Sequence, residues 1–415
     1  MKVLVAHSGW QHSAHLAYAL QKADLLAAYV TTIYDTPDSH LISMLKKIPF
    51  APFREGIKTR KCAKLNNRFV HPTCTIAGLL SVAFNRMGLK RLYLINESIL
   101  NWRFGRKVAR LAIKLKVDAV VMYEGKAARA FRILRTANPD VIKVIDSAAA
   151  CSLFVHKMAV DEYRSMGSDA PFFRELLCDD ADNRVIAKEV MLADRYLVAS
   201  SYVARSLTES GVASEKIMVS AYGGNFPIVD FAKEPPMDRP LRFVYCGRCT
   251  ARKGVHHLLE AFKGAEEQLR LVGSYDSTDS YIKQWLDEQN ISFVGKVTHD
   301  KVVQHLDWAD VFIFPSLTDG MSLACAEALC RGLPLVCTDR TGISDYIDNG
   351  TNGFVVPAGD SESLASAVAW FRDHSDSIPL MSARALDTAR LLTWAHYDER
   401  ISDLFEGLTP LATGK

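Results

Sequence analysis

The sequence predicts an α/β protein built from two doubly wound, Rossmann-like domains that face each other across a linker. Three observations support this fold class. The chain has 415 residues, which is more than one hydrophobic core usually serves. Short apolar segments alternate with amphipathic helical segments almost throughout, the pattern of parallel sheets covered by helices on both faces. A stretch rich in Gly and Pro divides the chain near its middle.

Five segments in the first half have the length and the apolar content of strands. We expect strands near residues 2–6, 26–31, 118–123, 141–145 and 195–199. The pattern then breaks at Gly223 and Gly224, and Pro235, Pro236 and Pro240 stiffen the segment that follows. Few contacts are expected to cross such a stretch, so it is the predicted domain boundary.

The second half repeats the rhythm of strand and helix. We expect its strands near residues 242–246, 269–273, 291–295, 311–315, 334–338 and 353–356, followed by helices over 378–392 and 395–407. The predicted division is an N-terminal domain over 1–225, a linker over 226–240, a C-terminal domain over 241–390 and a C-terminal helix over 391–415 that returns to the N-terminal domain.

Composition is that of an ordinary globular protein, with 49% hydrophobic and 23% charged residues. The chain has no run of 18 apolar residues, so we expect no spanning helix, and its first residues are typical of a strand rather than an export signal. Nine scattered cysteines favour a reducing compartment, and we expect a cytoplasmic protein. Cys246 and Cys249 either carry redox or metal chemistry, or they are two small residues that flank a functional Gly-Arg pair. No second pair with metal-ligand spacing accompanies them, so no metal site is predicted.

Positive charge is concentrated in one segment, although the net charge is only +3. Residues 41–116 carry 17 Lys and Arg against two acids, Glu55 and Glu97. Such a segment favours a polyanion or an anionic membrane surface. Within it, Thr75 to Met87 is apolar and forms either a helix in a membrane interface or a helix packed under the first sheet. No recognition motif with interleaved aromatic residues favours nucleic acid.

The loop from Gly247 to Gly254 follows the first strand of the second half. Its glycines let backbone amides approach an anion, while Arg248 offers a planar fork and Lys253 a point charge. Two cations five residues apart around such a turn suit a diphosphate. The alternative is an ordinary solvated basic loop.

A second group of residues runs from Asp319 to Glu327, after the strand near 311–315. The turn between them contains Gly320, Met321 and Ser322, and its amides face the carboxyl end of the strand, where open sheets bind ligands. Glu327 is either an exposed carboxylate on a surface helix or a bidentate acceptor for two ribose hydroxyls.

Taken together, these motifs resemble the donor domain of family 4 glycosyltransferases, retaining enzymes of the GT-B fold, in which the two domains face a central cleft. The similarity is strong from about 240 to 375. It is carried by G-R-x-x-x-x-K-G, F-V-G-K-V, A-D-V-F-I-F-P-S, D-G-M-S-L, E-A-L-C-R-G-L-P-L-V and N-G-F-V-V-P. Over the first half it is weaker, where A-D-R-Y-L-V-A-S-S-Y-V-A-R-S-L and K-I-M-V-S-A-Y-G-G-N-F match the final segments of an acceptor domain.

The resemblance implies roles for individual residues. Arg248 and Lys253 would grip the diphosphate of a nucleotide sugar, with UDP or GDP as the nucleotide, and neutralise the leaving group. Asp319 would address the sugar hydroxyls, and Glu327 would hold the ribose. The remaining donor contacts would come from glycine loops and the turn: Gly9, Gly247, Gly320, Met321 and Ser322.

Three positions depart from the family pattern. Asp319 stands where a glutamate is usual, and the loop around Gly9 has one glycine where two are common. Asp146 stands at a strand end where family members often have a histidine; it either orients a sugar hydroxyl or caps a helix that begins at Ala148. Retaining transfer in this family is thought to need no enzymic base, because the leaving phosphate takes the acceptor proton. Glu124 is a second carboxylate near the same cleft.

The implied function is retaining hexosyl transfer to a glycan or lipid-linked acceptor, in cell-surface polysaccharide or lipopolysaccharide synthesis, with peripheral binding to the inner face of the membrane. Two alternatives stay open. One is another enzyme on the same scaffold, such as a nucleotide-sugar epimerase or a phosphorylase, although no lysine in a recognisable pyridoxal phosphate setting was found. The other is a catalytically silent nucleotide-sugar-binding protein.

Overall fold

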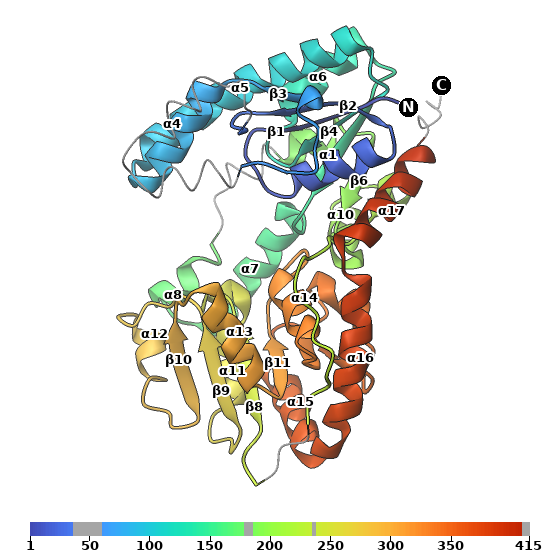
Figure 1. Cartoon of the computed structure of the whole chain (residues 1–415). Helices are drawn as coiled ribbons and strands as arrows, with labels where there is room; N and C mark the ends of the chain where they lie inside the picture. The colour runs from blue at the N-terminus through green and yellow to red at the C-terminus, as the bar shows by residue number, and fades with distance from the viewer. Residues whose placement is uncertain (36–59, 178–185, 235–237, 409–415) are drawn as a thin grey trace.

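The computed structural model describes residues 1–35, 60–177, 186–234 and 238–408, which form two α/β domains, one above the other in Figure 1. Each domain has one parallel sheet with helices packed against it. The predicted fold class is therefore confirmed. Much of the basic segment, residues 41–59, lies outside the described residues.

The N-terminal sheet has seven parallel strands in the order β3-β2-β1-β4-β5-β6-β7. Its strands are β1 (Val3–His7), β2 (Leu26–Thr31), β3 (Val70–Pro72), β4 (Ala119–Tyr123), β5 (Ile142–Ser147), β6 (Arg195–Val198) and β7 (Ile217–Val219). All five expected strands are present within two residues of their predicted ends. The two strands that the sequence pattern missed, β3 and β7, have three residues each and lie at the sheet edges.

Side chains of the central strands alternate between two hydrophobic cores. Val3 and Val5 of β1 belong to one core, and Leu4 and Ala6 belong to the other. A sheet buried on both faces needs helices on both. The helices of this half of the chain are α1 (Ser13–Lys22), α4 (Thr75–Arg86), α5 (Lys90–Leu115), α6 (Ala128–Ala137), α7 (Ser152–Met166), α8 (Pro171–Arg174) and α10 (Ser201–Glu209), and of these α4 packs on α5 and α8 on α12.

The C-terminal sheet has six parallel strands in the order β10-β9-β8-β11-β12-β13. Its strands are β8 (Arg242–Cys246), β9 (Gln268–Val272), β10 (Ile291–Gly295), β11 (Val311–Phe314), β12 (Leu335–Thr338) and β13 (Gly353–Val356). Its helices are α11 (Val255–Ala261), α12 (Ser280–Lys283), α13 (His299–Trp308), α14 (Leu323–Cys330), α15 (Ser361–Asp373) and α16 (Ile378–Leu391). The strand order reverses between β8 and β11, so a ligand crevice is expected there.

The last described helix, α17 (Trp394–Glu406), leaves the C-terminal domain and packs against α1 of the N-terminal domain (Figure 1). The guanidinium of Arg400 donates a hydrogen bond to the carbonyl of Ala221 at 2.8 Å. The imidazole of His15 stacks on the indole of Trp394 with ring centroids 3.8 Å apart. The C-terminal helix thus joins the two domains a second time.

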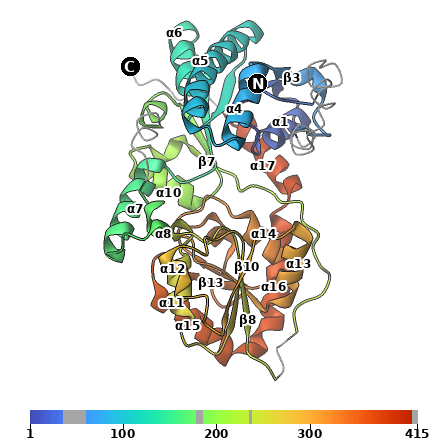
Figure 2. The same cartoon turned by 90° about the vertical axis from the view of Figure 1, so that its left-hand side faces the viewer.

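Direct contacts also join the domains near the ends of their strands. Ser200, after β6, donates its hydroxyl hydrogen to the carbonyl of Gly320 at 2.9 Å, and Tyr202 donates to Thr318 Oγ1 at 2.8 Å. The helix α7 reaches from the N-terminal domain alongside the C-terminal one (Figure 2). The carboxyl ends of β6 and β11 therefore meet at the junction between the domains.

Candidate functional site

The candidate site lies where loops after the central strands of both sheets come together. The C-terminal domain contributes the loop after β8 and the turn after β11, and the N-terminal domain contributes the loops after β1 and β5. Carboxyl ends of parallel strands are the usual ligand edge of such sheets. The sequence motifs and the topology therefore indicate the same place.

Lys253 and Asp319 form an ion pair at this edge, although 66 residues separate them in sequence. The pairing depends on Gly254, which has φ +66°, and a side chain there would place its Cβ 1.9 Å from the carbonyl oxygen of Pro315. Because only glycine permits this approach, the loop after β8 packs directly on the end of β11. Lys253 Nζ also lies 5.1 Å from the ring centroid of Phe314.

The turn after Asp319 packs on the N-terminal domain. A Cβ at Gly320 would lie 1.9 Å from the carbonyl oxygen of Ala148, in the loop that follows β5. Met321 and Ser322 are buried, and the Ser322 hydroxyl accepts a hydrogen bond from the amide of Cys325, which caps α14. The turn thus joins the start of α14 to the opposite domain.

Glu327 is not a freely exposed carboxylate, because only 9% of the residue's surface is accessible. Its Oε1 lies 3.3 Å from Nε2 of His299, the first residue of α13. Burial raises the pKa of Glu327, while His299 and Arg331 act in the opposite direction. The carboxylate is therefore largely buried and paired with His299, and 12% of its side chain stays accessible.

Arg248 is exposed and lines a cavity of about 350 Å³ beneath α8. Its carbonyl accepts a hydrogen bond from the hydroxyl of Tyr245 at 2.8 Å, which fixes the backbone of the loop. Gly247 has a φ of +159° and packs against the same tyrosine ring. No ion pair joins Arg248 to the Lys253–Asp319 pair among the described residues.

Asp146 is fully buried and binds two side chains of its own domain. His12 donates from Nε2 to Oδ2 at 2.9 Å, and the hydroxyl of Tyr222 donates to Oδ1 at 3.1 Å. The expected helix start at Ala148 is wrong, because α7 begins at Ser152 with no side-chain cap. Asp146 therefore holds His12, a residue of the loop after β1, rather than a helix end.

The loop around Gly9 is held closely against β1 and β2. The amide of Gly9 donates to Nδ1 of His7 at 2.6 Å, and the hydroxyl of Thr31 donates to the carbonyl of Gly9 at 3.1 Å. Burial, together with the nearby His12, lowers the pKa of His7 to about 4. His7 is therefore neutral at physiological pH and accepts the amide hydrogen.

Glu124 lines a cavity of about 800 Å³ that also includes Trp102 and Lys126. Burial raises the pKa of Glu124 to about 7, against the effect of a hydrogen bond from Ser147 Oγ at 3.1 Å. A carboxyl with a pKa near neutrality in a cavity can donate or accept a proton at physiological pH. This makes Glu124 a stronger site candidate than its sequence context alone indicated.

This part of the chain contains the two cysteines of the C-G-R-C sequence and, after them, a pair of histidines. Burial raises the pKa of both Cys246 and Cys249 to about 12, so neither is a thiolate at neutral pH. His256 and His257 follow in the first turn of α11. Both are buried at the domain junction against Glu162, a contact that the sequence did not reveal because 94 residues separate Glu162 from His256.

Comparison with known proteins shows what the C-terminal domain is similar to. Residues 240–373 match the family model described as glycosyl transferases group 1. A putative colanic acid biosynthesis glycosyltransferase, WcaL of Salmonella typhimurium, is 30% identical over 208 residues, covering 46% of this chain and 51% of the relative. Other relatives are named glycosyltransferases of amylovoran and capsular polysaccharide biosynthesis. The chain spans about half the length of the curated relatives it matches first.

Solved structures share the whole architecture. The apo lipopolysaccharide outer core galactosyltransferase WaaB superposes with a TM-score of 0.63 at 15% identity, over 98% of this chain and all of that one. HepE of Anabaena in complex with UDP has a TM-score of 0.60 at 15% identity, with the same coverage. At such identities the likeness is one of fold, and that fold is GT-B.

Proposed function

We propose that this chain is a retaining glycosyltransferase, because residues 240–373 match the family model described as glycosyl transferases group 1 and the chain has the GT-B fold. It would transfer a sugar from a nucleotide diphosphate-sugar to a hydroxyl of a glycan or glycolipid acceptor. The observation that carries the proposal is the Lys253–Asp319 pair, which lies beside a turn that packs on the opposite domain.

The donor would bind with its diphosphate at the loop after β8. Lys253 would then pair with the phosphate oxygens as well as with Asp319. Arg248 would reach the same oxygens from the cavity beneath α8. Neutralising the phosphates favours departure of the nucleotide diphosphate as the glycosidic bond breaks. UDP as the nucleotide is supported by the UDP complex of HepE, a protein with the same fold.

Asp319 and Glu327 would contact two other parts of the donor, the sugar and the ribose. Asp319 is 16% exposed at its side chain and would accept hydrogen bonds from the sugar hydroxyls, with the Gly320 to Ser322 turn beside it. Glu327, on α14, would accept both ribose hydroxyls. We assign Asp319, Gly320, Met321, Ser322 and Glu327 to the donor site, together with Gly9, Gly247, Arg248 and Lys253.

Asp146 would act as a positioning residue for His12. The fully buried carboxylate of Asp146 cannot reach a ligand, whereas the His12 side chain keeps 11% of its surface exposed. The 2.9 Å hydrogen bond fixes the ring of His12 where the loop after β1 approaches the cleft. His12 would thus take the part of the histidine that the family often has at the end of β5, although His12 follows β1.

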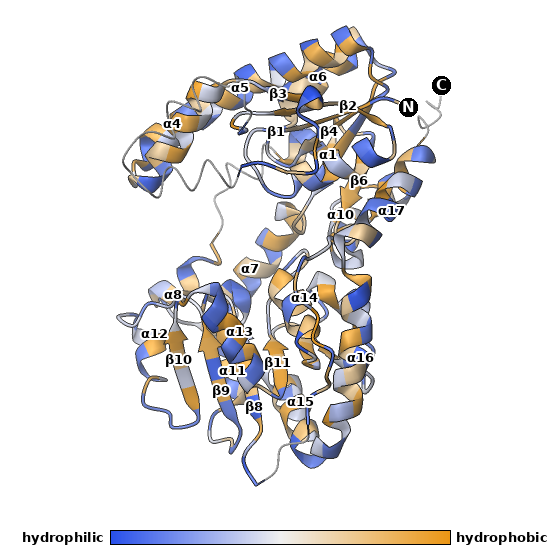
Figure 3. Ribbon diagram, viewed as in Figure 1, coloured by the Kyte–Doolittle hydropathy of each residue, from blue (hydrophilic) through white to orange (hydrophobic). Residues whose placement is uncertain are grey.

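We propose that the chain binds the cytoplasmic face of an anionic membrane and meets its acceptor there. Among the described residues, half of the exposed large hydrophobic ones belong to the segment from α4 to α5: Ile76, Leu80, Met87, Leu89, Leu92, Leu94, Ile95, Ile99, Trp102 and Ile113. Cationic residues, Arg103, Arg106, Lys107 and Arg110, line a cavity of about 710 Å³ on the same helices. Figure 3 shows hydrophobic and hydrophilic positions alternating along α4 and α5. Exposed apolar residues together with basic ones favour an anionic lipid interface. No helix among the described residues meets the length and hydropathy needed to cross a bilayer.

The test is incubation of the purified chain with UDP- and GDP-sugars, with nucleotide diphosphate release as the readout. Release accompanied by sugar transfer, or by slow hydrolysis that first yields the donor's own anomer in a proton NMR spectrum, supports a retaining transferase. Interconversion of donor sugars would instead identify an epimerase. Binding without turnover of any donor would identify a silent nucleotide-sugar-binding protein.

A further inference from the structure

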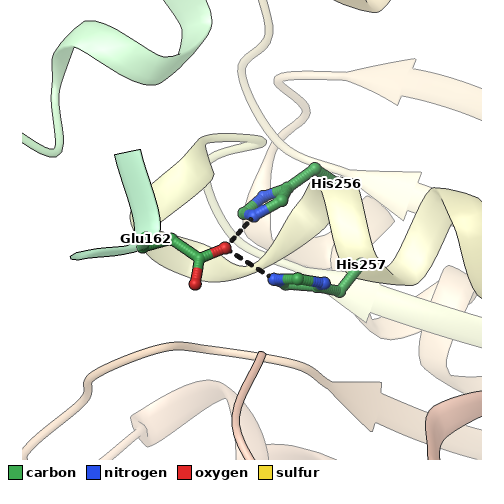
Figure 4. A group of neighbouring side chains, drawn as sticks. All are labelled: Glu162, His256 and His257. Atoms are coloured by element: carbon green, nitrogen blue, oxygen red, sulfur yellow. Dashed lines mark hydrogen bonds and ion pairs between the residues drawn. The ribbon is translucent and has the colours of Figure 1, made fainter. Parts of the chain in front are cut away.

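We propose that Glu162, His256 and His257 form a binding site for a divalent transition-metal ion, Zn²⁺, at the junction between the two domains. Glu162 lies on α7 of the N-terminal domain, and the two histidines open α11 of the C-terminal domain (Figure 4). This site is separate from the proposed donor contacts and is not needed for the proposed transfer.

The three side chains converge on one point. Oε1 of Glu162 lies 2.8 Å from Nε2 of His256 and 2.8 Å from Nε2 of His257, and all the ligand atoms lie within 4.8 Å of one another. In a tetrahedral zinc site, ligand atoms at about 2.0–2.1 Å from the metal lie about 3.3 Å apart. A shift of roughly half an ångström at each side chain therefore makes room for the ion.

The surroundings leave one coordination position open. Gly359 has no side chain, and a Cβ there would lie 3.5 Å from Oε2 of Glu162 and 3.8 Å from Nε2 of His257. Gly359 and Glu162 also line a cavity of about 630 Å³ that includes Asp161 and Arg340. Three protein ligands with a fourth position reached from a solvent-filled cavity is the pattern of a metal site that keeps a water or an exchangeable ligand.

The donor set and its support favour zinc over magnesium or calcium. Two imidazole nitrogens and one carboxylate oxygen suit Zn²⁺, whereas Mg²⁺ and Ca²⁺ prefer oxygen ligands alone. Nδ1 of His257 lies 3.0 Å from Oγ of Ser361, so Ser361 can accept the Nδ1 hydrogen when Nε2 binds metal. Burial opposes ionisation of Glu162, but the hydrogen bonds from both histidines prevail and lower its pKa to about 2.

Without an ion, the same residues form two hydrogen bonds from imidazole to carboxylate. Either arrangement holds α7 against α11, but a metal ion would replace two hydrogen bonds by three coordinate bonds across the domain junction. Zinc binding would then tether the domains and raise the stability of the folded chain, since a ligand specific for the native state stabilises it.

The chain is first treated with EDTA, and the EDTA is then removed. The test is titration of ZnCl₂ into this chain, measured by isothermal titration calorimetry. We expect one Zn²⁺ per chain and no comparable binding of Mg²⁺. Glu162→Gln keeps the size of the side chain, and it should weaken zinc affinity at least about 10-fold. The double variant His256→Ala/His257→Ala should abolish the high-affinity site.

The matched control is His374→Ala, which removes an exposed histidine of the C-terminal domain and should leave zinc affinity unchanged. The melting temperature of each variant in EDTA shows whether it folds. If the double variant does not fold, the zinc affinity of Glu162→Gln decides the test. Absence of zinc binding by the unmodified chain up to about 100 μM, or unchanged affinity in Glu162→Gln, would overturn the proposal.

Discussion

Lys253 is the residue that connects the fold to the proposed chemistry, because it lies between Asp319 and the expected position of the diphosphate. Lys253→Ala removes one of the charges that would stabilise the leaving group, and preorganised electrostatic contacts of this kind are worth about 10²- to 10³-fold in rate. We expect kcat/KM for donor turnover to fall by that factor, measured as nucleotide diphosphate release. The fold should survive, since the side chain lies at the edge of the cleft.

The control for this variant is Lys263→Ala, which removes an exposed lysine beyond the end of α11. Its donor turnover should equal that of the unmodified chain, and both variants should melt at nearly the same temperature. Full activity in Lys253→Ala would remove the proposed diphosphate contact.

Glu327 supports a second prediction at the same scale. Loss of two hydrogen bonds to a charged acceptor, each worth about 1.5–3 kcal/mol, weakens binding by about 100-fold or more. Glu327→Ala should therefore raise the KM for the donor by about that factor, while the affinity for inorganic pyrophosphate stays unchanged. A variant with an unaltered KM would return Glu327 to the role of a partly buried carboxylate paired with His299.

Glu124 makes stability depend on pH in a defined direction. Burial raises its pKa in the folded chain to about 7, above the usual value of 4.5, so the folded state binds a proton that the unfolded state releases. This contribution is favourable at low pH and is lost as pH rises from about 4.5 through 7. Glu124→Gln removes the charge and keeps an acceptor for Ser147, so the variant should gain stability relative to the unmodified chain at pH 8.

The expected difference is up to about 3 kcal/mol between pH 5 and pH 8, since each pKa unit corresponds to about 1.4 kcal/mol. Urea unfolding at the two pH values measures it, provided that both chains unfold with the same m-value. Asp140→Asn, at an exposed carboxylate of the same domain, is the control and should show no such pH-dependent gain. Parallel curves for Glu124→Gln and the unmodified chain would mean that this carboxyl is ionised freely.

At the scale of elements, the long central strands were predictable because burial on both faces gives them continuous apolar runs. The edge strands β3 and β7 were not, since three residues carry no period and the pairing with β2 and β6 lies in the tertiary structure. The donor-side loops were found because their glycines and charges are close in sequence. The pairing of His12 with Asp146 was missed, because the two residues lie 134 positions apart and only the order of strands brings them together.

The sequence left open whether α4 lies in a membrane interface or packs under the first sheet, and its burial decides between the two. Only Gly78 and Ser81 of its twelve residues are buried, so α4 does not lie under the first sheet. The helix packs on α5 instead, and Ile76 and Leu80 keep 68% and 41% of their surfaces exposed. Its apolar residues are thus available to a membrane or a partner.

The α4–α5 surface gives the prediction at this scale. Ile95 and Ile99 lie one turn apart on α5 and are 59% and 50% exposed. Burying an isoleucine contributes about 1.5–3 kcal/mol, so Ile95→Glu/Ile99→Glu should reduce binding to phosphatidylglycerol vesicles at least about 10-fold in a sedimentation assay. Donor turnover in solution should stay unchanged, because these residues are remote from the donor contacts.

Leu380→Glu is the matched control, because Leu380 is 67% exposed on α16 of the other domain. It should sediment with vesicles as the unmodified chain does. If the unmodified chain stays in the supernatant at low salt, or if the double variant binds equally well, the α4–α5 surface has another partner. Weakening of binding by salt would add that the basic residues contribute.

At the scale of the whole molecule, the proposed site exists only while the two domains are closely apposed. The turn at Gly320 touches Ala148, and the hydroxyls of Ser200 and Tyr202 bond to the segment that leads into it. These contacts bring Asp319 of one domain next to the β5 loop of the other. Sugar transfer in a cleft of this kind depends on that distance.

Gly320→Ala tests the dependence directly. The added Cβ would lie 1.9 Å from the carbonyl oxygen of Ala148 and 2.8 Å from its carbon, and backbone atoms cannot give way as the end of a side chain can. The domains must then separate locally, and a misplacement of about 1 Å costs on the order of 100-fold in rate. We expect kcat to fall by about that factor, while the C-terminal domain keeps its fold and its affinity for the free nucleotide diphosphate.

The matched variant is Gly407→Ala at the end of α17, where an added Cβ meets only an ordinary contact at 3.5 Å. Its kcat should equal that of the unmodified chain. Because Gly320→Ala changes no charge and removes no hydrogen-bonding side chain, a large fall in kcat with unchanged nucleotide affinity would show that transfer depends on how this turn sits against the opposite domain. An unchanged kcat would instead mean that transfer proceeds in a more open arrangement, with Asp146 and His12 too distant to contribute.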